Sequence, residues 1–342
     1  MQMLASVLAG AVVWAAGAQT LSPENALRET FADQASALEG RVRTHGAGAF
    51  LDALPHLPGV GEGRSIRYDR STGEAMTNAD FDALADDDPS RDRFNVLPVD
   101  DTLYYTRLFG TPALYTRALD LASVHGVPTF DDARILDFGF GQVGHLRALA
   151  STGAHCVGVE VNPLLEAMYS EQGDTGLIDR HDGAEPGPPG TLRLVYGSWP
   201  GDEGVRAKVD GRYDLIISKN VLKRGYIHPE READPSQLID LGVDDDVFIR
   251  ALHDALVPGG LVVIYNFSPA QAPDDEPYIP WADGRCPFGQ EQWTSAGFEV
   301  LAHDVNDTEE AIEHFVAVGA GDREGLEGNL FGMYTVVRKP VD

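Results

Sequence analysis

Residues 135–144 read Ile-Leu-Asp-Phe-Gly-Phe-Gly-Gln-Val-Gly, and this stretch decides the fold. A short apolar run, which predicts a buried strand, passes directly into a glycine-rich turn. A segment of helical character over 143–151 follows at once. Glycine lets the backbone bend sharply and lets a ligand approach without a Cβ in the way. The pattern therefore predicts a strand, a ligand-binding turn and a helix whose N-terminus presents free N–H groups.

Beyond this turn, short apolar runs alternate with segments of helical periodicity to the end of the chain. Such alternation is typical of a parallel sheet with crossover helices. The expected strands are 134–138, 156–161, 192–196, 213–218, 261–267, 298–305 and 333–338. The expected helices are 143–151, 163–171, 245–256, 289–296 and 308–316.

The glycine-rich turn carries a carboxylate two residues before its first glycine. As G-x-G-x-x-G alone, the turn would also fit a dinucleotide site, but Asp137 would repel a pyrophosphate and suits a cationic amino group. Asp137, Gly139 and Gly141 resemble motif I of class I S-adenosylmethionine-dependent methyltransferases, in which the acid orients the methionine moiety. The resemblance implies that these residues and the intervening Phe140 contact the cofactor. Gly144 lies one position later than the commonest third glycine of that family.

Two further segments follow in the order of that family. Glu160 ends the second expected strand about 20 residues beyond the glycines, where a carboxylate can accept hydrogen bonds from both ribose hydroxyls. The neighbouring Val161 is also expected to contact the cofactor. The alternative for Glu160 is a solvated acid at the end of a strand, without a ligand. Ser198, after the third strand, stands where the family often has an acid that contacts adenine. Trp199 either stacks on the adenine ring or packs in the core.

The fourth expected strand resembles motif IV of the family, whose end lies beside the transferable methyl group. The resemblance places Ser218 among the cofactor contacts and makes Lys219, Asn220, Tyr226 and His228 the candidate catalytic residues. Lys219 equally fits a helix-start side chain that reaches towards solvent. His228 is a candidate general base because its ordinary pKa lies near neutrality, with exposed polar surface as the alternative.

With Leu-x-Pro-Gly-Gly over 256–260 and Ala-Gly-Phe over 296–298, the matches extend over 134–339. The resemblance implies an α/β, Rossmann-like, mainly parallel seven-stranded sheet with an antiparallel last strand and helices on both faces. It also implies S-adenosyl-L-methionine as cofactor, in a methyltransferase domain over 111–342. Two alternatives remain: a catalytically inactive binding protein that keeps the fold, and an NAD-dependent oxidoreductase. Asp137 and the Leu-x-Pro-Gly-Gly turn argue against the oxidoreductase.

The first 110 residues lack the strand–helix alternation. Residues 1–18 resemble a secretory signal peptide, being apolar and ending in Ala-Gly-Ala, although no basic residue precedes the apolar run. A mis-assigned start or an apolar packing helix is the alternative. Residues 19–110 predict a mostly helical extension with loops. We expect it to form a substrate lid, with Asp101, Tyr104 and Tyr105 pointing towards the site; the alternative is that the tyrosines pack the extension onto the sheet.

The charge of the chain restricts its partners. Lys and Arg number 26 against 54 Asp and Glu, a formal net charge of −28. Such a surface repels phosphate backbones, which argues against nucleic acid and favours a small, neutral or cationic substrate. Cys156 and Cys286 are too far apart in sequence to suggest a metal cluster. We expect an exported protein if the signal is cleaved and a cytoplasmic one otherwise, without stable membrane insertion; the oligomeric state stays open.

Overall fold

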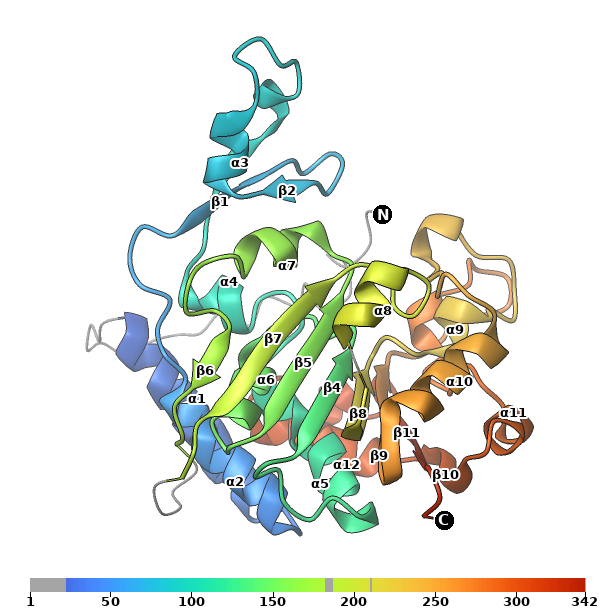
Figure 1. Cartoon of the computed structure of the whole chain (residues 1–342). Helices are drawn as coiled ribbons and strands as arrows, with labels where there is room; N and C mark the ends of the chain where they lie inside the picture. The colour runs from blue at the N-terminus through green and yellow to red at the C-terminus, as the bar shows by residue number, and fades with distance from the viewer. Residues whose placement is uncertain (1–22, 182–186, 210, 342) are drawn as a thin grey trace.

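The computed structural model describes residues 23–181, 187–209 and 211–341, so the expected signal peptide over 1–18 lies outside the described residues. The main body is built on an eight-stranded sheet of order β10-β11-β9-β8-β4-β5-β7-β6 (Figure 1). Its strands are β4 Arg134–Phe138, β5 His155–Glu160, β6 Gly176–Ile178, β7 Gly190–Tyr196, β8 Tyr213–Lys219, β9 Leu256–Ser268, β10 Glu299–Asn306 and β11 Phe331–Arg338.

The pairing confirms the predicted fold class. Strands β7, β5, β4, β8 and β9 are parallel neighbours, and β11 lies antiparallel between β9 and β10. All seven expected strands are present, and β6 adds an antiparallel eighth at the edge. The chain moves outward from β4 through β5 to β7, and then returns to the other side of β4 to form β8. This reversal makes the carboxyl ends of β4 and β8 a topological switch point, where ligands of open α/β sheets bind.

Helices cover both faces of the sheet. One face carries α5 Thr116–His125, α6 Gly144–Ala150 and α12 Thr308–Ala317, and the other carries α8 Glu203–Val209, α10 Asp245–Ala255 and α11 Gln290–Ser295. Alternation along β4 puts Ile135 in the first core and Leu136 in the second. Asp137 therefore shares the face of Ile135, beneath α5 and α6.

The extension contains more strand than the sequence indicates. It begins with helices α1 Pro23–Glu39 and α2 His45–Ala53, and Thr44 caps α2, since its side chain accepts from the Ala47 N–H. Where we expected loops, β1 Ser65–Tyr68, β2 Ala75–Met76 and β3 Asn95–Pro98 form an antiparallel sheet of order β2-β1-β3. The extension is mostly helical, as expected, and the small sheet is an addition that the sequence did not indicate. Strands of two to four residues carry too little periodicity to be recognised from the sequence.

The small sheet projects from one end of the main body in Figure 1, with α3 Asn78–Ala83 on the side away from that body. It packs on α7 Pro163–Met168, which follows β5. A buried ion pair fixes this contact: Arg64, directly before β1, pairs with Asp174 at 2.5 Å. The Tyr104 hydroxyl donates to the other oxygen of Asp174 at 2.8 Å. Within the described part of the chain, no helix is long and apolar enough to cross a bilayer.

We expect Gly158→Ala to destabilise the protein, because Gly158 lies in β5 directly beneath the glycine-rich turn. A Cβ there would come within 2.7 Å of Phe140 and 2.8 Å of Leu146. Overpacking of this kind costs about 1–3 kcal/mol, so thermal unfolding should show a Tm several degrees lower. Gly48→Ala is the matched control, since a Cβ on this α2 residue meets nothing within 4 Å and alanine favours a helix. Equal Tm values for the two variants would contradict the expectation.

Candidate functional site

A buried polar cluster lies at the switch point. Asp137 is fully buried, and its Oδ2 lies 2.5 Å from Nε2 of His145 in α6. The His145 ring stacks on Tyr115, with the ring centroids 3.5 Å apart. The Tyr115 hydroxyl is near the carboxylate, but the acceptor within hydrogen-bond distance is the Phe140 carbonyl oxygen, at 3.4 Å. Among the described residues, the buried Oδ1 of Asp137 has no hydrogen-bond partner.

Lys219, the last residue of β8, completes this cluster. Its Nζ lies 4.7 Å from the centroid of the Tyr115 ring and 5.4 Å from that of Phe267, and only 6% of the residue is exposed. Burial lowers the pKa of Lys219 to about 8, although the nearby Asp137 acts in the opposite direction. Burial also lowers the pKa of His145, a change that Asp137 opposes and Lys219 reinforces.

The glycine-rich turn adopts the backbone that its sequence predicts. Gly139 and Gly141 have positive φ values of 73° and 61°, which favour glycine. A Cβ on Gly139 would lie 2.5 Å from Cγ2 of Val221, and one on Gly141 would lie 3.1 Å from the Phe109 ring. Side chains from the β8 loop and from the extension thus close over this turn.

Gln142 fixes the extension to the turn. Its Oε1 accepts from the backbone N–H groups of Leu108 and Phe109, and its Nε2 donates to the Leu103 carbonyl oxygen. Gln142 is almost fully buried, so these hydrogen bonds are shielded from water. Residues 103–109 are consequently a wall of the site. This role follows from the three-dimensional contacts of Gln142, and no sequence motif indicated it.

Glu160 is the last residue of β5, the second expected strand. Its carboxylate accepts three backbone hydrogen bonds, from Gly141 at 3.2 Å, Val161 at 2.8 Å and Asn162 at 3.2 Å. Burial raises the pKa of Glu160, and the three N–H donors oppose that rise. A carboxylate offers about four acceptor positions, so one remains for a ligand hydroxyl. The neighbouring Val161 side chain is 60% exposed.

The other residues expected to contact the cofactor lie in different environments. Phe140 is buried, and its ring lies 6.1 Å from that of Tyr169. Ser218 is buried and donates to the Phe138 carbonyl oxygen at 3.1 Å. Ser198 is half-buried in the loop after β7, against Gly242.

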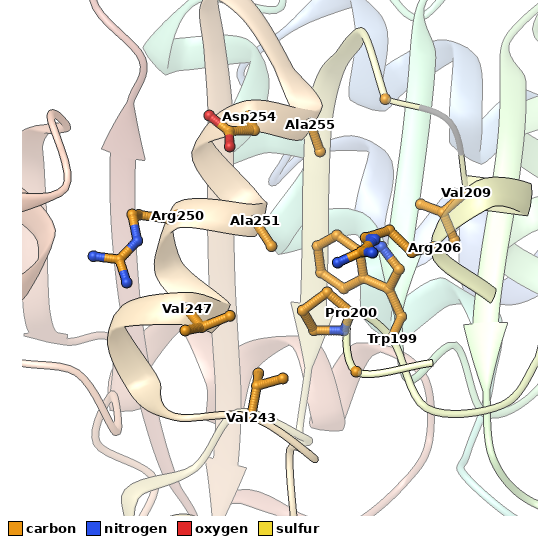
Figure 2. Close-up of a pocket in the computed structure, with 12 residues that line it drawn as sticks. Trp199, Pro200, Arg206, Val209, Val243, Val247, Arg250, Ala251, Asp254 and Ala255 are labelled. Carbon is orange, nitrogen blue, oxygen red and sulfur yellow. The ribbon is translucent and has the colours of Figure 1, made fainter. Parts of the chain in front are cut away.

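Trp199 packs in the core of the α8–α10 face, with its ring centroid 6.1 Å from that of Phe138 and 5.8 Å from that of Phe248. It also borders a hollow of about 430 Å³ between α8 and α10 (Figure 2). In that view Arg250 points away from the hollow. No residue of the glycine-rich turn lines this hollow.

The remaining candidate catalytic residues do not join the cluster around Asp137. Asn220 has a positive φ of 65°, and its side-chain oxygen accepts from the Phe267 N–H at 2.7 Å, which ties the β8 loop to β9. Tyr226 lies beside Lys223, and burial raises the pKa of its hydroxyl to about 12. His228 is 2.9 Å from Asp245 at the start of α10 and borders a separate hollow.

The three side chains expected to point from the extension into the site have other partners. Asp101 accepts from the Val60 N–H at 2.7 Å, and the Tyr105 hydroxyl donates to the Pro58 carbonyl oxygen at 2.8 Å. Tyr104 bonds to Asp174, as described above. The tyrosines therefore pack the extension onto the body, and Phe109 is the residue that lies on the turn. Among the described residues no group of His, Cys, Asp and Glu could hold a metal ion.

Comparison with known proteins finds solved structures with distant similarity to this chain. No family model and no curated sequence match this chain. Among solved structures, phosphoethanolamine N-methyltransferase 2 of Haemonchus contortus is 16% identical with a TM-score of 0.40, over 68% of this chain and 55% of that one. The chain thus spans about half the length of that enzyme. The [4+2]-cyclase SpnF is 16% identical with a TM-score of 0.37, over 67% of this chain and 82% of its own.

The cyclopropane synthase MmaA2 of Mycobacterium tuberculosis is 14% identical with a TM-score of 0.35, over 64% of this chain and 82% of its own. Similarities this distant carry no conclusion about the chemistry of this chain. Its function is therefore inferred from the residues at the switch point.

Burial of Lys223 makes the stability of the protein depend on pH. Its Nζ donates to the carbonyl oxygens of Phe267 and Trp281, and burial lowers its pKa to about 7 from 10.5. A neutral amine supplies the two N–H donors that these acceptors need. Between these two pH values the unfolded chain binds more protons than the folded chain, so the free energy of unfolding rises with pH.

We expect a difference in unfolding free energy, the wild-type value minus the value for Lys223→Met, that increases between pH 7.5 and 9.5. The slope approaches about 1.4 kcal/mol per pH unit, the value for one proton released on folding. Urea unfolding at several pH values measures it. Lys208→Met, at an exposed lysine in α8, is the matched control and should give a flat difference. A flat difference for Lys223→Met as well would contradict a neutral buried amine.

Proposed function

We propose that the chain is a methyltransferase that binds S-adenosyl-L-methionine at the switch point between β4 and β8. The observation that carries this proposal is the combination of an unpartnered, fully buried Asp137 oxygen with Glu160 at the end of the adjacent strand. The glycine-rich turn joins the two, because Gly141 donates to Glu160. An ammonium group and a ribose hydroxyl are the donors that these two carboxylates lack.

The residues present fit such a ligand. Asp137 would take the amino group of the methionine moiety, and Glu160 would take a ribose hydroxyl. Gly139 and Gly141 supply the positive φ values that the turn of the site requires. Phe109 and Val221 lie against these two glycines and would form the apolar side of the site. An NAD-dependent oxidoreductase is less well supported, because Asp137 would face a pyrophosphate.

The cofactor supplies an activated methyl group on a sulfonium, so the protein needs mainly to align the acceptor and to exclude water. Gln142 holds residues 103–109 against the turn, and the extension thereby shields this edge of the site. We accordingly assign residues 19–110 to an extension that forms a wall over the site, and residues 111–342 to the methyltransferase domain. Lys219, the last residue of β8, makes no hydrogen bond within the described structure.

The acceptor is proposed to be a small neutral or cationic molecule. A net charge of −28 produces a negative potential over most of the surface, which slows the approach of anions. The basic side chains near the site are few, and Lys223 is occupied by two carbonyl groups. A polyanion would need many phosphate contacts that this surface does not offer.

We expect Asp137→Asn and Glu160→Gln each to weaken binding of S-adenosylmethionine. Each substitution replaces a charged acceptor with a neutral amide, and a hydrogen bond to a charged group contributes about 1.5–3 kcal/mol, or roughly 10- to 150-fold in Kd. Isothermal titration calorimetry measures the loss, with Glu62→Gln as an exposed control. Tight NAD binding without a response to S-adenosylhomocysteine would contradict the proposal.

A screen with methyl-labelled cofactor tests the acceptor class. Small amines, phenols and thiols are offered beside peptides and RNA, at low and high salt. We expect label in a small neutral or cationic molecule and none in RNA, because the field of the protein opposes polyanions. Labelled RNA together with unmodified small molecules would reverse this assignment.

A further inference from the structure

The hollow of about 430 Å³ between α8 and α10 is separate from the candidate site. Its walls come from the loop after β7, from α8 and from α10, and neither Asp137, Glu160 nor Lys219 lines it (Figure 2). A volume of this size is within the range of small-molecule pockets. The hollow is therefore a candidate site for a ligand other than the cofactor or the methyl acceptor.

The wall from α10 is apolar. Val243, Val247 and Ala251 follow one another at intervals of four residues, so they form one stripe along the helix and the segment before it. Arg250 and Asp254 also border the hollow, but both side chains point away from it in Figure 2. Val247 is 42% exposed, so the other described parts of the chain do not cover this stripe. It can accept the apolar body of a ligand.

The opposite wall contributes two hydrogen-bond donors without acceptors. Arg206 lines the hollow from α8, and its guanidinium makes no hydrogen bond or ion pair within the described structure. Asp202, one turn earlier, accepts from the Val205 N–H instead. Trp199 is 4% exposed, and its indole N–H also makes no hydrogen bond with the described residues. Both groups can donate to a ligand, and the charge of Arg206 favours an anionic acceptor.

Arginines without a partner are few in this acidic chain. The arginines of the described structure whose side chains make no hydrogen bond, ion pair or ring contact are Arg70, Arg206, Arg212 and Arg250. Two of these four border the hollow. Acidic residues outnumber basic ones 54 to 26, so partners are plentiful elsewhere on the protein. The protein itself thus supplies no anion to Arg206 at this hollow.

We propose that the hollow binds a small organic anion with an apolar ring. The anionic group accepts from Arg206 and Trp199, and the ring lies against the stripe of Val243, Val247 and Ala251. An amine would meet the like charge of Arg206, and an inorganic anion would leave the stripe uncovered. A helix of another chain is too large, because a cylinder about 10 Å wide along the roughly 12 Å of the stripe occupies roughly 900 Å³. This inference does not depend on the proposed function.

NMR titration of the wild type with two naphthalene probes tests the proposal. The probes are 2-naphthoate and its neutral amide, 2-naphthamide, which share the ring and differ in charge. We expect 2-naphthoate to bind about fivefold more tightly, the upper value for an ion pair open to solvent. This preference should decrease as salt is added. S-adenosylhomocysteine should displace neither probe, because no residue of the glycine-rich turn lines the hollow.

Three variants locate the probes. Arg206→Met should remove the preference for 2-naphthoate and leave the affinity for 2-naphthamide unchanged. Arg70→Met is the matched control and should keep the preference, since Arg70 is an exposed arginine of the extension that also lacks a partner. Ala251→Phe places a ring in the hollow and should abolish binding of both probes.

The proposal is overturned if the wild type binds neither probe, or binds both equally. Displacement by S-adenosylhomocysteine, an unchanged preference in Arg206→Met, or binding to a folded Ala251→Phe would place the probe elsewhere. If Ala251→Phe does not fold, the wild type and Arg206→Met still decide the matter. Sedimentation tests the other occupant: a dimer that Val247→Asp separates into monomers would show that a second copy covers the stripe, and would also overturn the proposal.

Discussion

The buried carboxylate of Asp137 is the constraint on which the candidate site depends. A charge at the end of the central strand, with no access to water, must be compensated by its neighbours. His145 in α6 makes a hydrogen bond with one oxygen of this carboxylate. The Tyr115 ring, in the segment before α5, stacks on the imidazole of His145. The helix that follows the glycine-rich turn is therefore fixed to the strand that precedes it. Loss of this pair would loosen the turn itself, because both of its flanks depend on the same contact.

The N-terminal extension belongs to the site as well as to the fold. Two buried polar residues of the body, Gln142 and Asp174, bind it at separate points. Gln142 binds the backbone of residues 103–109, and Asp174 binds Arg64 and Tyr104. Removing one partner of a buried ion pair typically costs about 3–5 kcal/mol, so this attachment is strong. A wall held in this way keeps Phe109 on Gly141 and limits the access of water to the turn.

Local patterns predicted the main sheet because its strands are apolar runs bounded by glycine and proline. The run before Asp137 coincides with β4, whereas β9 begins at Leu256 instead of 261, since the Pro-Gly-Gly segment itself joins the strand. The small sheet of the extension was missed because Ala75–Met76 is too short to show alternation. His145 was also missed, because a histidine within an apolar helix gives no sign of the carboxylate that it meets in space. Alternation along β8 does place Lys219 on the face of Ile217.

The distribution of basic residues connects the composition to the site. The chain has 26 basic residues against 54 acidic ones and only four lysines, two of which, Lys219 and Lys223, are buried at the end of β8. A third, Lys339, donates to the carbonyl oxygens of His253 and Leu256. Three of the four lysines thus place their amino groups against carbonyl groups or aromatic rings of the protein. With most of the lysines held inside, the long-range field of the protein is set by its acidic surface. That field selects against polyanions, and the site must distinguish smaller ligands by contacts at short range, where solvent screens charge less.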